Sequence, residues 1–290
     1  MNWVPFLFID SVCHQLELDS ITQVKHLSND WHRFAIEHDE NRRRLNLKCQ
    51  VNGPDVLYFI QDSRNFVDFP GVLIGDLDSE YDRIASVTCE SGIFEGNRVS
   101  LDEFQFDLLP LLAPLVANSA WWYLHSDWIL NRFFFTAFAN CAGFKEIRVI
   151  EQGRESLDFL LRQAEFGNVQ LLYLSAEDPI SSWSEPEKLG KALEKFVNSS
   201  RFHQLTSRGP QENDLELMMM FLERALANEL QPAAHLFIGN VTFDESQLES
   251  VYPQCREYSK LKNYFEWWIP NSSLKVTIHL QRAQLFMQCV

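Results

Sequence analysis

The histidines of this chain are the residues whose type and spacing come closest to a metal or acid–base site. Eight are present, and three of them, His26, His32 and His38, recur every six residues. A step of six residues turns a helix by about 240°, so these side chains cannot converge on one metal ion from one helical face. We expect them to be solvated or hydrogen-bonded locally.

Paired polar residues offer a second route to chemistry. Asp10 and His14 lie four residues apart in a helical pattern, close enough for a hydrogen bond. No nucleophile accompanies them, so we expect a surface pair and not a catalytic dyad. Two acidic pairs in or near predicted loops could act as acid and base, but such pairs arise by chance in a chain with 40 acidic residues: Asp76/Asp78 and Glu185/Glu187.

The chain lacks the short motifs that carry common catalytic chemistry. It contains no GxGxxG, GxxxxGK(S/T), GxSxG or HExxH pattern. Its six cysteines are far apart and include no CxxC pair, which argues against a zinc site or a compact disulfide framework and suits a reducing compartment. We therefore predict a protein that is not an enzyme and that uses no metal or other cofactor.

Composition and charge favour a folded protein whose partners are not nucleic acids. Hydrophobic residues make up 46% of the chain, which suits a packed core, and 290 residues allow one large domain or two modest ones. The formal net charge of −15 repels a phosphate backbone. The one dense basic run, residues 42–44, follows Asp39 and Glu40 and is expected to be a solvated helix end.

Nothing in the sequence predicts a membrane segment. The first residues lack a basic region, and Asp10 interrupts their apolar run, which argues against a signal peptide. The longest apolar stretch, residues 108–124, contains two prolines, Asn118 and Ser119, and its length is marginal for a bilayer span. We expect it to be buried core, and we expect a cytoplasmic or nuclear protein.

The elements that must position these residues begin with two or three short amphipathic helices over residues 4–34. Pro5 suits a first helical turn, and Ser20 can cap a second helix. Helices of this length are not stable alone, so they must pack on something else. Apolar side chains recur at steps of three and four residues, which places each set on one helical face: Phe8, Ile9, Val12, Leu16, Ile21, Val24, Leu27, Trp31 and Phe34.

The rest of the chain alternates strand and helix patterns, which predicts an α/β body. Five strands follow one another at intervals of about 24 to 33 residues, as in solenoid-like or open α/β sheets. Residues 61–97 allow no assignment. Strands are expected at 45–51, 56–60, 120–124, 145–150, 169–175, 202–205 and 235–241, helices at 101–116, 127–139, 156–164, 187–197 and 215–226, and closing antiparallel strands at 264–269, 274–280 and 283–289.

The opening helices resemble an F-box, the short helical motif by which substrate receptors dock onto cullin–RING ubiquitin ligases. The family pattern opens with an apolar residue and proline, matched by residues 4–5, and its small residue and tryptophan three apart are matched by Ser28 and Trp31. The chain departs from the pattern at Cys13, where an aliphatic residue is usual, and at Ser20, where an acidic residue is usual. The apolar positions that match in register are Ile9, Val12, Leu16, Val24 and Leu27.

A second resemblance lies further along the chain. Asp127-Trp128, Asn140-Cys141 and the strand expected at 147–150 are similar to the core of the F-box-associated domain of the large nematode F-box families. In that domain a strand, a helix and another strand recur, and antiparallel strands close the chain. The likeness is closest over residues 4–34 and weaker over 121–175.

These resemblances imply an F-box-like helical module at residues 1–44 and an α/β substrate-binding domain at residues 45–290. The implied partners are the linker subunit of a cullin–RING ligase and a protein substrate. The linker would contact Val4, Pro5, Ile9, Val12, Leu16, Ile21 and Val24. Trp183, Trp267 and Trp268 are candidate substrate contacts, because exposed aromatic residues often carry binding energy.

Two functional hypotheses remain besides an uncharacterised enzyme. In the first, the chain is a substrate receptor of a ubiquitin ligase, with Trp31 and Phe34 anchoring the module internally and Pro5 and Ile9 facing the linker. In the second, the chain is a non-catalytic scaffold whose F-box-like helices bury their apolar face on its own body. The exposure of Pro5 and Ile9 is the feature that separates the two.

Overall fold

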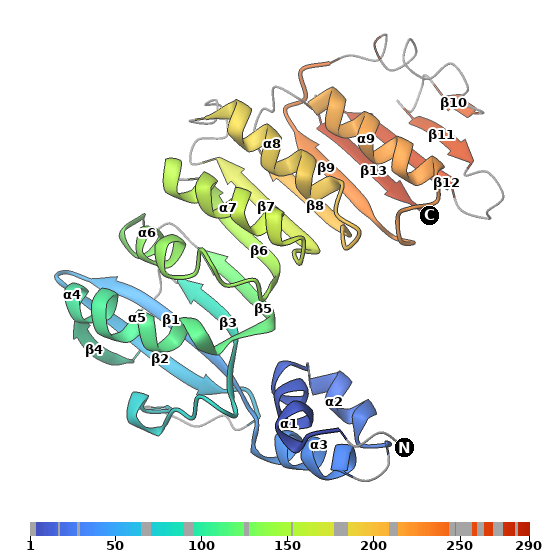
Figure 1. The fold of residues 1–290 in the computed structure, drawn as a ribbon. Helices are drawn as coiled ribbons and strands as arrows, with labels where there is room; N and C mark the ends of the chain where they lie inside the picture. The colour runs from blue at the N-terminus through green and yellow to red at the C-terminus, as the bar shows by residue number, and fades with distance from the viewer. Residues whose placement is uncertain are drawn as a thin grey trace. The chain divides into compact units, whose positions relative to one another are not determined.

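The computed structural model has the α/β fold that the sequence predicted (Figure 1). Two compact units make up the chain, Met1–Lys145 (unit 1) and Glu146–Val290 (unit 2). In the part of the chain that the structure describes, no helix is long and apolar enough to cross a membrane. The described residues are 4–16, 18–27, 30–64, 71–89, 95–124, 128–151, 153–176, 185–208, 214–243, 247, 257–259, 264–268, 275–281 and 284–290.

Unit 1 opens with three helices, which we call the helical module. They are α1 (Phe6–Gln15), α2 (Leu18–Val24) and α3 (Asp30–Asn41), and α3 packs against both of the others. Together they enclose a small core of Ile9, Cys13, Ile21 and Ala35. The predicted short helices are therefore present, and they bury their apolar faces on one another. The predicted boundary at residue 44 stays a prediction, since the module lies inside unit 1.

A mixed sheet follows the module in unit 1. β1 pairs with β2 in an antiparallel hairpin and with β3 in parallel, so the strand order is β5-β3-β1-β2-β4. Residues 61–97 allowed no assignment from sequence. The structure places β3 and the single turn η1 (Ile74–Asp76) in this stretch, and β4 begins at its end. The strands are β1 (Arg43–Asn52), β2 (Asp55–Asp62), β3 (Asp82–Cys89), β4 (Asn97–Ser100) and β5 (Val116–Leu124).

Much of the apolar stretch near residue 110 is buried core of unit 1, as expected, with Leu108, Leu109, Leu112 and Leu115 buried and Leu111 exposed. It forms consecutive short helical pieces, because Pro110 and Pro114 have no N–H to donate along a regular helix. The pieces are α4 (Leu101–Glu103), the π-helical turn η2 (Phe104–Leu108), α5 (Leu109–Leu112) and η3 (Ala113–Leu115), and α6 (Trp128–Ala137) follows β5. The buried ring of Trp122 packs between Phe134, Phe135, Phe138 and Phe144.

Unit 2 alternates parallel strands with helices and then turns antiparallel. Strands β6 to β9 are parallel neighbours, and β13, β12, β11 and β10 continue the sheet in antiparallel order, so the closing strands are confirmed and β10 is added. The elements are β6 (Phe144–Glu151), α7 (Arg154–Phe166), β7 (Leu171–Ala176), α8 (Pro186–Val197), β8 (Gln204–Arg208), α9 (Asp214–Leu226), β9 (His235–Gly239), β10 (Glu257–Ser259), β11 (Tyr264–Trp268), β12 (Lys275–Gln281) and β13 (Gln284–Cys289).

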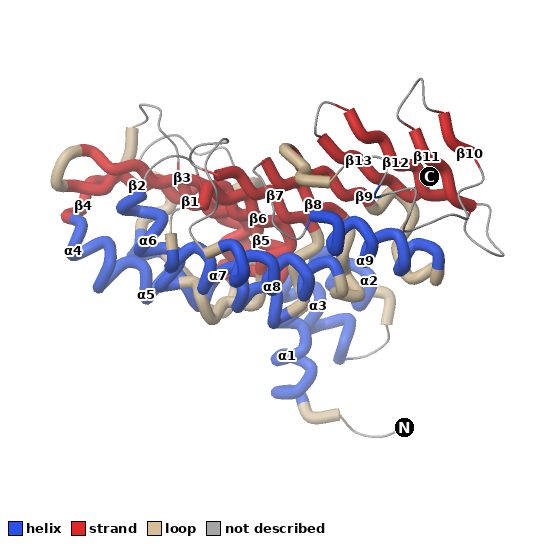
Figure 2. Tube along the Cα trace, turned by 90° about the horizontal axis from the view of Figure 1, so that it is seen from above, coloured by secondary structure: helices blue, strands red, loops and turns tan. Residues whose placement is uncertain are grey.

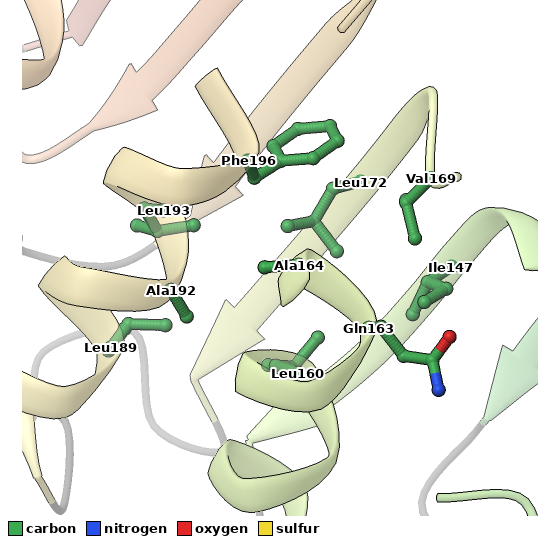
Figure 3. A pocket seen from close by; sticks show the side chains of 10 residues that line it. All are labelled: Ile147, Leu160, Gln163, Ala164, Val169, Leu172, Leu189, Ala192, Leu193 and Phe196. Carbon is green, nitrogen blue, oxygen red and sulfur yellow. The ribbon is translucent and has the colours of Figure 1, made fainter. Parts of the chain in front are cut away.

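The helices of unit 2 cover one face of its sheet (Figure 2). Alternate residues of the strands form their buried layer, with Ile147 beside Leu172 and Leu172 beside Leu205 in register. Figure 3 shows side chains of α7 and α8 closing over Ile147 and Leu172. The gap between them has a volume of ≈ 10 Å³, which is room for about one water molecule and not for a ligand.

Candidate protein-docking site

The candidate docking site is built on α1, which starts where the sequence predicted. Pro5 has an extended backbone (φ −57°, ψ 137°), and its carbonyl oxygen accepts hydrogen bonds from the N–H groups of Phe8 (3.0 Å) and Ile9 (3.2 Å). Proline suits this place because its missing N–H has no helical acceptor there. The chain leaves the helix again at Leu16, whose backbone is extended.

The module buries two residues that we had expected to contact a partner. Ile9 is 2% exposed and Ile21 is 0% exposed, both inside the core shared by the three helices. In this structure the apolar face formed by their spacing meets α3 within the same chain; their contact with the linker subunit stays a prediction. Val4, Leu16, Val24, Trp31 and Phe34 are partly buried against the same core, while Pro5 is exposed and Val12 half-buried.

A different set of apolar side chains is exposed. Phe6 is 46% exposed, Leu7 83% and Phe8 55%, and we call these three residues the docking patch. Leu27, three residues beyond α2, is 52% exposed as well. The helical spacing predicted Phe8 only as part of a helical face. A usable signal was present, however, because three consecutive apolar residues cannot all point to one side of a helix.

Aromatic contacts hold the docking patch in place. The Phe6 ring centroid lies 6.1 Å from that of Phe34, and the Phe8 ring meets Trp31 edge-on at 6.5 Å. The guanidinium of Arg33 lies over both Phe6 (5.4 Å) and Phe34 (4.9 Å), an arrangement that attracts a cation to a ring face. The patch is thus an ordered surface presented by α1 and backed by α3.

A buried arginine fixes the other end of α1. Arg42 is 2% exposed, and its guanidinium donates hydrogen bonds to the carbonyl oxygens of Cys13 (2.8 Å), His14 (3.0 Å) and Leu16. A cation at a helix C-terminus is stabilised by the orphan carbonyls and the helix dipole. Burial lowers the pKa of Arg42 to about 10, so the group stays charged at neutral pH. The expectation of a solvated basic run was wrong here.

Histidines tie α1 to α3 and to the first strands. His38 is fully buried, and its Nε2 lies 2.8 Å from Oδ1 of Asp10, so Asp10 pairs with α3 and not with His14 as expected. The His14 ring contacts Nη2 of Arg83 on β3 at 2.6 Å. Burial, and then the charge of Arg83, lower the pKa of His14. Both side chains are structural contacts.

The remaining expected site residues form no reactive cluster in the described part of the chain. Asp78 accepts a turn hydrogen bond from the N–H of Glu80 (2.8 Å), and Glu185 pairs with Lys188 within α8. No group of three or more His, Cys, Asp or Glu among the described residues is placed to hold a metal ion. Burial raises the pKa of Cys141 and of Cys289 to about 11, which keeps both as unreactive thiols.

The aromatic residues expected to contact a substrate are only partly covered by the structure. Trp183 lies outside the described residues. Trp267 and Trp268 lie in β11, where their backbones pair with Val276 and Lys275 of β12, and their side chains are outside the described part.

Fold and site together define an α/β protein whose first unit opens with a helical module that exposes an apolar patch. The sequence matches no known family model, and no curated protein matches it significantly.

Proposed function

We propose that this protein is the substrate-recognition subunit of a cullin–RING ubiquitin ligase and that it docks through the helical module. One observation carries the proposal. The module has a complete core of its own and still exposes the consecutive apolar residues Phe6, Leu7 and Phe8. Exposed apolar clusters of this kind are typical of protein-binding surfaces.

The energetics of the docking patch suit a helix-packed interface. Burying one apolar side chain of this size contributes about 1.5 to 3 kcal/mol, so a partner that covers Leu7 and its two neighbours gains several kcal/mol. Little ordering cost opposes this gain, because aromatic contacts with α3 already hold Phe6 and Phe8. The patch is therefore pre-organised for a partner.

The competing hypothesis is a scaffold protein whose helices serve only its own fold. The burial of Ile9 and Ile21 in the module favours it. The contacts between the module and residues 81–83 include polar ones, however: the bond from Tyr81 Oη to Glu37 Oε1 (3.2 Å) and the contact of Arg83 with His14, beside the ring contact of His38 with Tyr81 at 5.4 Å. Leu7 is 83% exposed, so little of its surface is covered by the chain, which favours the docking hypothesis.

A capture experiment with purified linker subunit tests the proposal. We expect the wild type to capture the linker, and we expect Leu7→Asp and Phe8→Asp to lose at least about tenfold in affinity, since each places a charge in an apolar contact. Leu111→Asp is the matched control, because Leu111 is an exposed leucine (58%) on α5, outside the module. Ile9→Asp should unfold the module, as circular dichroism would show.

Two outcomes would contradict the proposal. One is that the wild type captures no linker under conditions in which a known F-box protein does. The other is that Leu7→Asp and Phe8→Asp, folded by circular dichroism, bind the linker as well as Leu111→Asp does.

A further inference from the structure

The sheet of unit 2 presents a second face, opposite to its helices, with a continuous row of side chains. Side chains of α7 and α8 lie over Ile147 and Leu172 (Figure 3), and α9 lies on the same side of the sheet as α7 and α8 (Figure 2). Side chains alternate between the two faces along a strand, so the strand residues next to Ile147 and Leu172 point away from the described helices. Register places one row across six neighbouring strands, from β6 to β12: Arg148, Tyr173, Thr206, Phe237, Phe286 and His279.

The residue types of this row are not those of a buried layer. Parallel strands with helices on both faces are nearly continuous in Val, Ile and Leu. Here the two faces differ, because Leu172, Leu205 and Leu236 line the helix side. The row itself is half-buried in the middle and exposed at Arg148 and His279. The face is thus adapted to remain accessible.

Aromatic rings and hydrogen-bonding groups alternate on the face. The Arg148 guanidinium stacks 4.2 Å from the centroid of the Tyr173 ring. The Phe286 ring lies 6.2 Å from His235 and 6.5 Å from His279. Gln204 donates to the hydroxyl of Thr206 (3.2 Å) between these aromatic groups. The aromatic rings can pack against apolar side chains of a ligand, and the neighbouring polar groups can hydrogen-bond to its main chain. This combination suits an extended peptide.

The charge of this face opposes that of the whole chain. Across these six strands and the adjacent β11, the described residues of this face include three cations, Arg148, Arg208 and Lys275, and two carboxylates, Glu146 and Glu266. Glu146 is 4% exposed and is bonded to Arg148 at 2.7 Å, and Glu266 is 5% exposed and is bonded to Lys275 at 2.9 Å. In a chain with a net charge of −15, these strands carry a small excess of cations, and the exposed Arg148 and Arg208 complement an acidic partner.

We infer that this face binds an extended segment of a protein that carries both acidic and aromatic side chains. The inference rests on the proposed function, for which it names the class of substrate. Six strands about 4.8 Å apart span about 24 Å, the length of about seven extended residues. Such a segment would lie across the strands, with its rings against Phe237 and Phe286 and its carboxylates towards Arg148, Arg208 and Lys275.

Single-stranded nucleic acid is the other macromolecule that stacks on aromatic sheet faces. Its affinity comes largely from phosphate contacts, and the charge of −15 opposes a polyanion of that density. An acidic peptide carries fewer charges and gains apolar contacts, so the observations favour the peptide.

Fluorescence anisotropy of the full chain with synthetic probes tests the inference. The probe is a labelled peptide of repeated Glu-Glu-Phe-Phe, which places a carboxylate and a ring on each side of an extended chain. We expect it to bind at least about tenfold more tightly than Glu-Glu-Ala-Ala or Lys-Lys-Phe-Phe repeats, and more tightly than an oligothymidylate of equal length. Preference for the acidic probe by an acidic protein cannot come from net charge.

Variants locate the binding. Arg148→Ser and Phe237→Ser should each weaken binding of the Glu-Glu-Phe-Phe peptide by about tenfold. Arg162→Ser should not, although Arg162 also stacks on a ring (4.8 Å from Phe166), because it lies on α7 in the helix layer. Circular dichroism identifies a variant that is unfolded, and the Arg148 side chain is 46% exposed, so its replacement keeps the test valid if Phe237→Ser fails to fold.

Three results would overturn the inference: no binding of the Glu-Glu-Phe-Phe peptide, equal or tighter binding of the lysine peptide or the oligothymidylate, or equal weakening by Arg162→Ser. The experiment contains no ligase component. Linker capture without peptide binding would therefore contradict only this inference, and peptide binding without linker capture would contradict only the proposed function.

Discussion

At the scale of single residues, the helical module depends on the buried guanidinium of Arg42. This side chain donates hydrogen bonds to carbonyl groups at the end of α1, and so it ties that end of α1 to the end of α3. Removing it would leave those carbonyls without their charged donor in a buried place.

We expect Arg42→Leu to lower the free energy of unfolding by about 2 to 3 kcal/mol, because hydrogen bonds to a charged group are lost. Urea denaturation measures this change. Arg154→Leu is the control, since the Arg154 side chain is 78% exposed on α7, and it should shift the unfolding free energy by less than about 0.5 kcal/mol. Similar losses for both variants would contradict the role of Arg42.

His14 gives the module a dependence on pH. Burial and the neighbouring Arg83, His38 and Arg42 lower its pKa, so the unfolded chain binds a proton more readily than the folded one. Stability from this site is then fully present above the unfolded pKa of about 6.5 and is lost as pH falls through the folded value.

Urea midpoints measured between pH 7.5 and pH 5 should therefore fall with pH in the wild type and fall less in His14→Gln. Gln23→Ala, an exposed change on α2 that removes no titratable group, should keep the wild-type slope. If His14→Gln follows the wild type at every pH, the site does not titrate in this way.

The exposed residues of α1 could be predicted from sequence only in part. Spacing placed Ile9, Val12 and Leu16 on one apolar face, and Ile9 and Leu16 do pack in the module core, while Val12 is half-buried. Spacing does not say what covers a face, and here α3 covers Ile9. The burial of Arg42 could not be foreseen, because its acceptors are carbonyls of a helix that lies 26 to 29 residues away in sequence.

At the scale of elements, two glycines control the sheet of unit 1. Gly53 (φ 65°) turns the chain between β1 and β2, and Gly71 (φ 73°) follows β2. Both adopt the left-handed conformation that glycine tolerates. They differ in space, because a Cβ on Gly71 would lie 2.5 Å from the carbonyl oxygen of Ile60, whereas a Cβ on Gly53 would meet nothing within 4 Å.

We expect Gly53→Ala to cost about 1 kcal/mol of unfolding free energy, from the backbone conformation alone. Gly71→Ala should cost about 3 kcal/mol or more, because the backbone of β2 must also shift. Urea denaturation of the two variants makes the comparison. Equal losses would show that the close approach at Gly71 carries no energy.

Most elements were predictable because their apolar residues repeat with a clear period. β1, β2 and α7 to α9 match their predicted ranges within a few residues. β3 was not predicted, because it begins with the charged residues Asp82 and Arg83 and its apolar side chains are mostly short. Asp82 is nonetheless buried, because Arg43 of β1 binds it with two hydrogen bonds of 2.7 and 2.6 Å. A hydrophobic pattern cannot predict the burial of such a charged residue, because its type marks it as exposed.

At the scale of the whole molecule, we propose separate surfaces for separate partners. The docking patch on α1 would bind the ligase linker, and the strand face of unit 2 would bind the substrate. The sequence predicted the α/β class and the helical module, but it could not give strand order, which depends on pairings between distant segments such as β9 with β13. The one-sided helix layer and its open strand face follow from that order.

The affinity of purified linker subunit for the full chain, measured by isothermal titration calorimetry, tests the central claim most directly. We expect saturable binding by the wild type and by Leu111→Asp, and we expect Leu7→Asp to be at least about tenfold weaker, since an apolar contact worth about 1.4 kcal/mol or more is lost. No binding by a folded wild type, or equal binding by folded Leu7→Asp, would contradict the account.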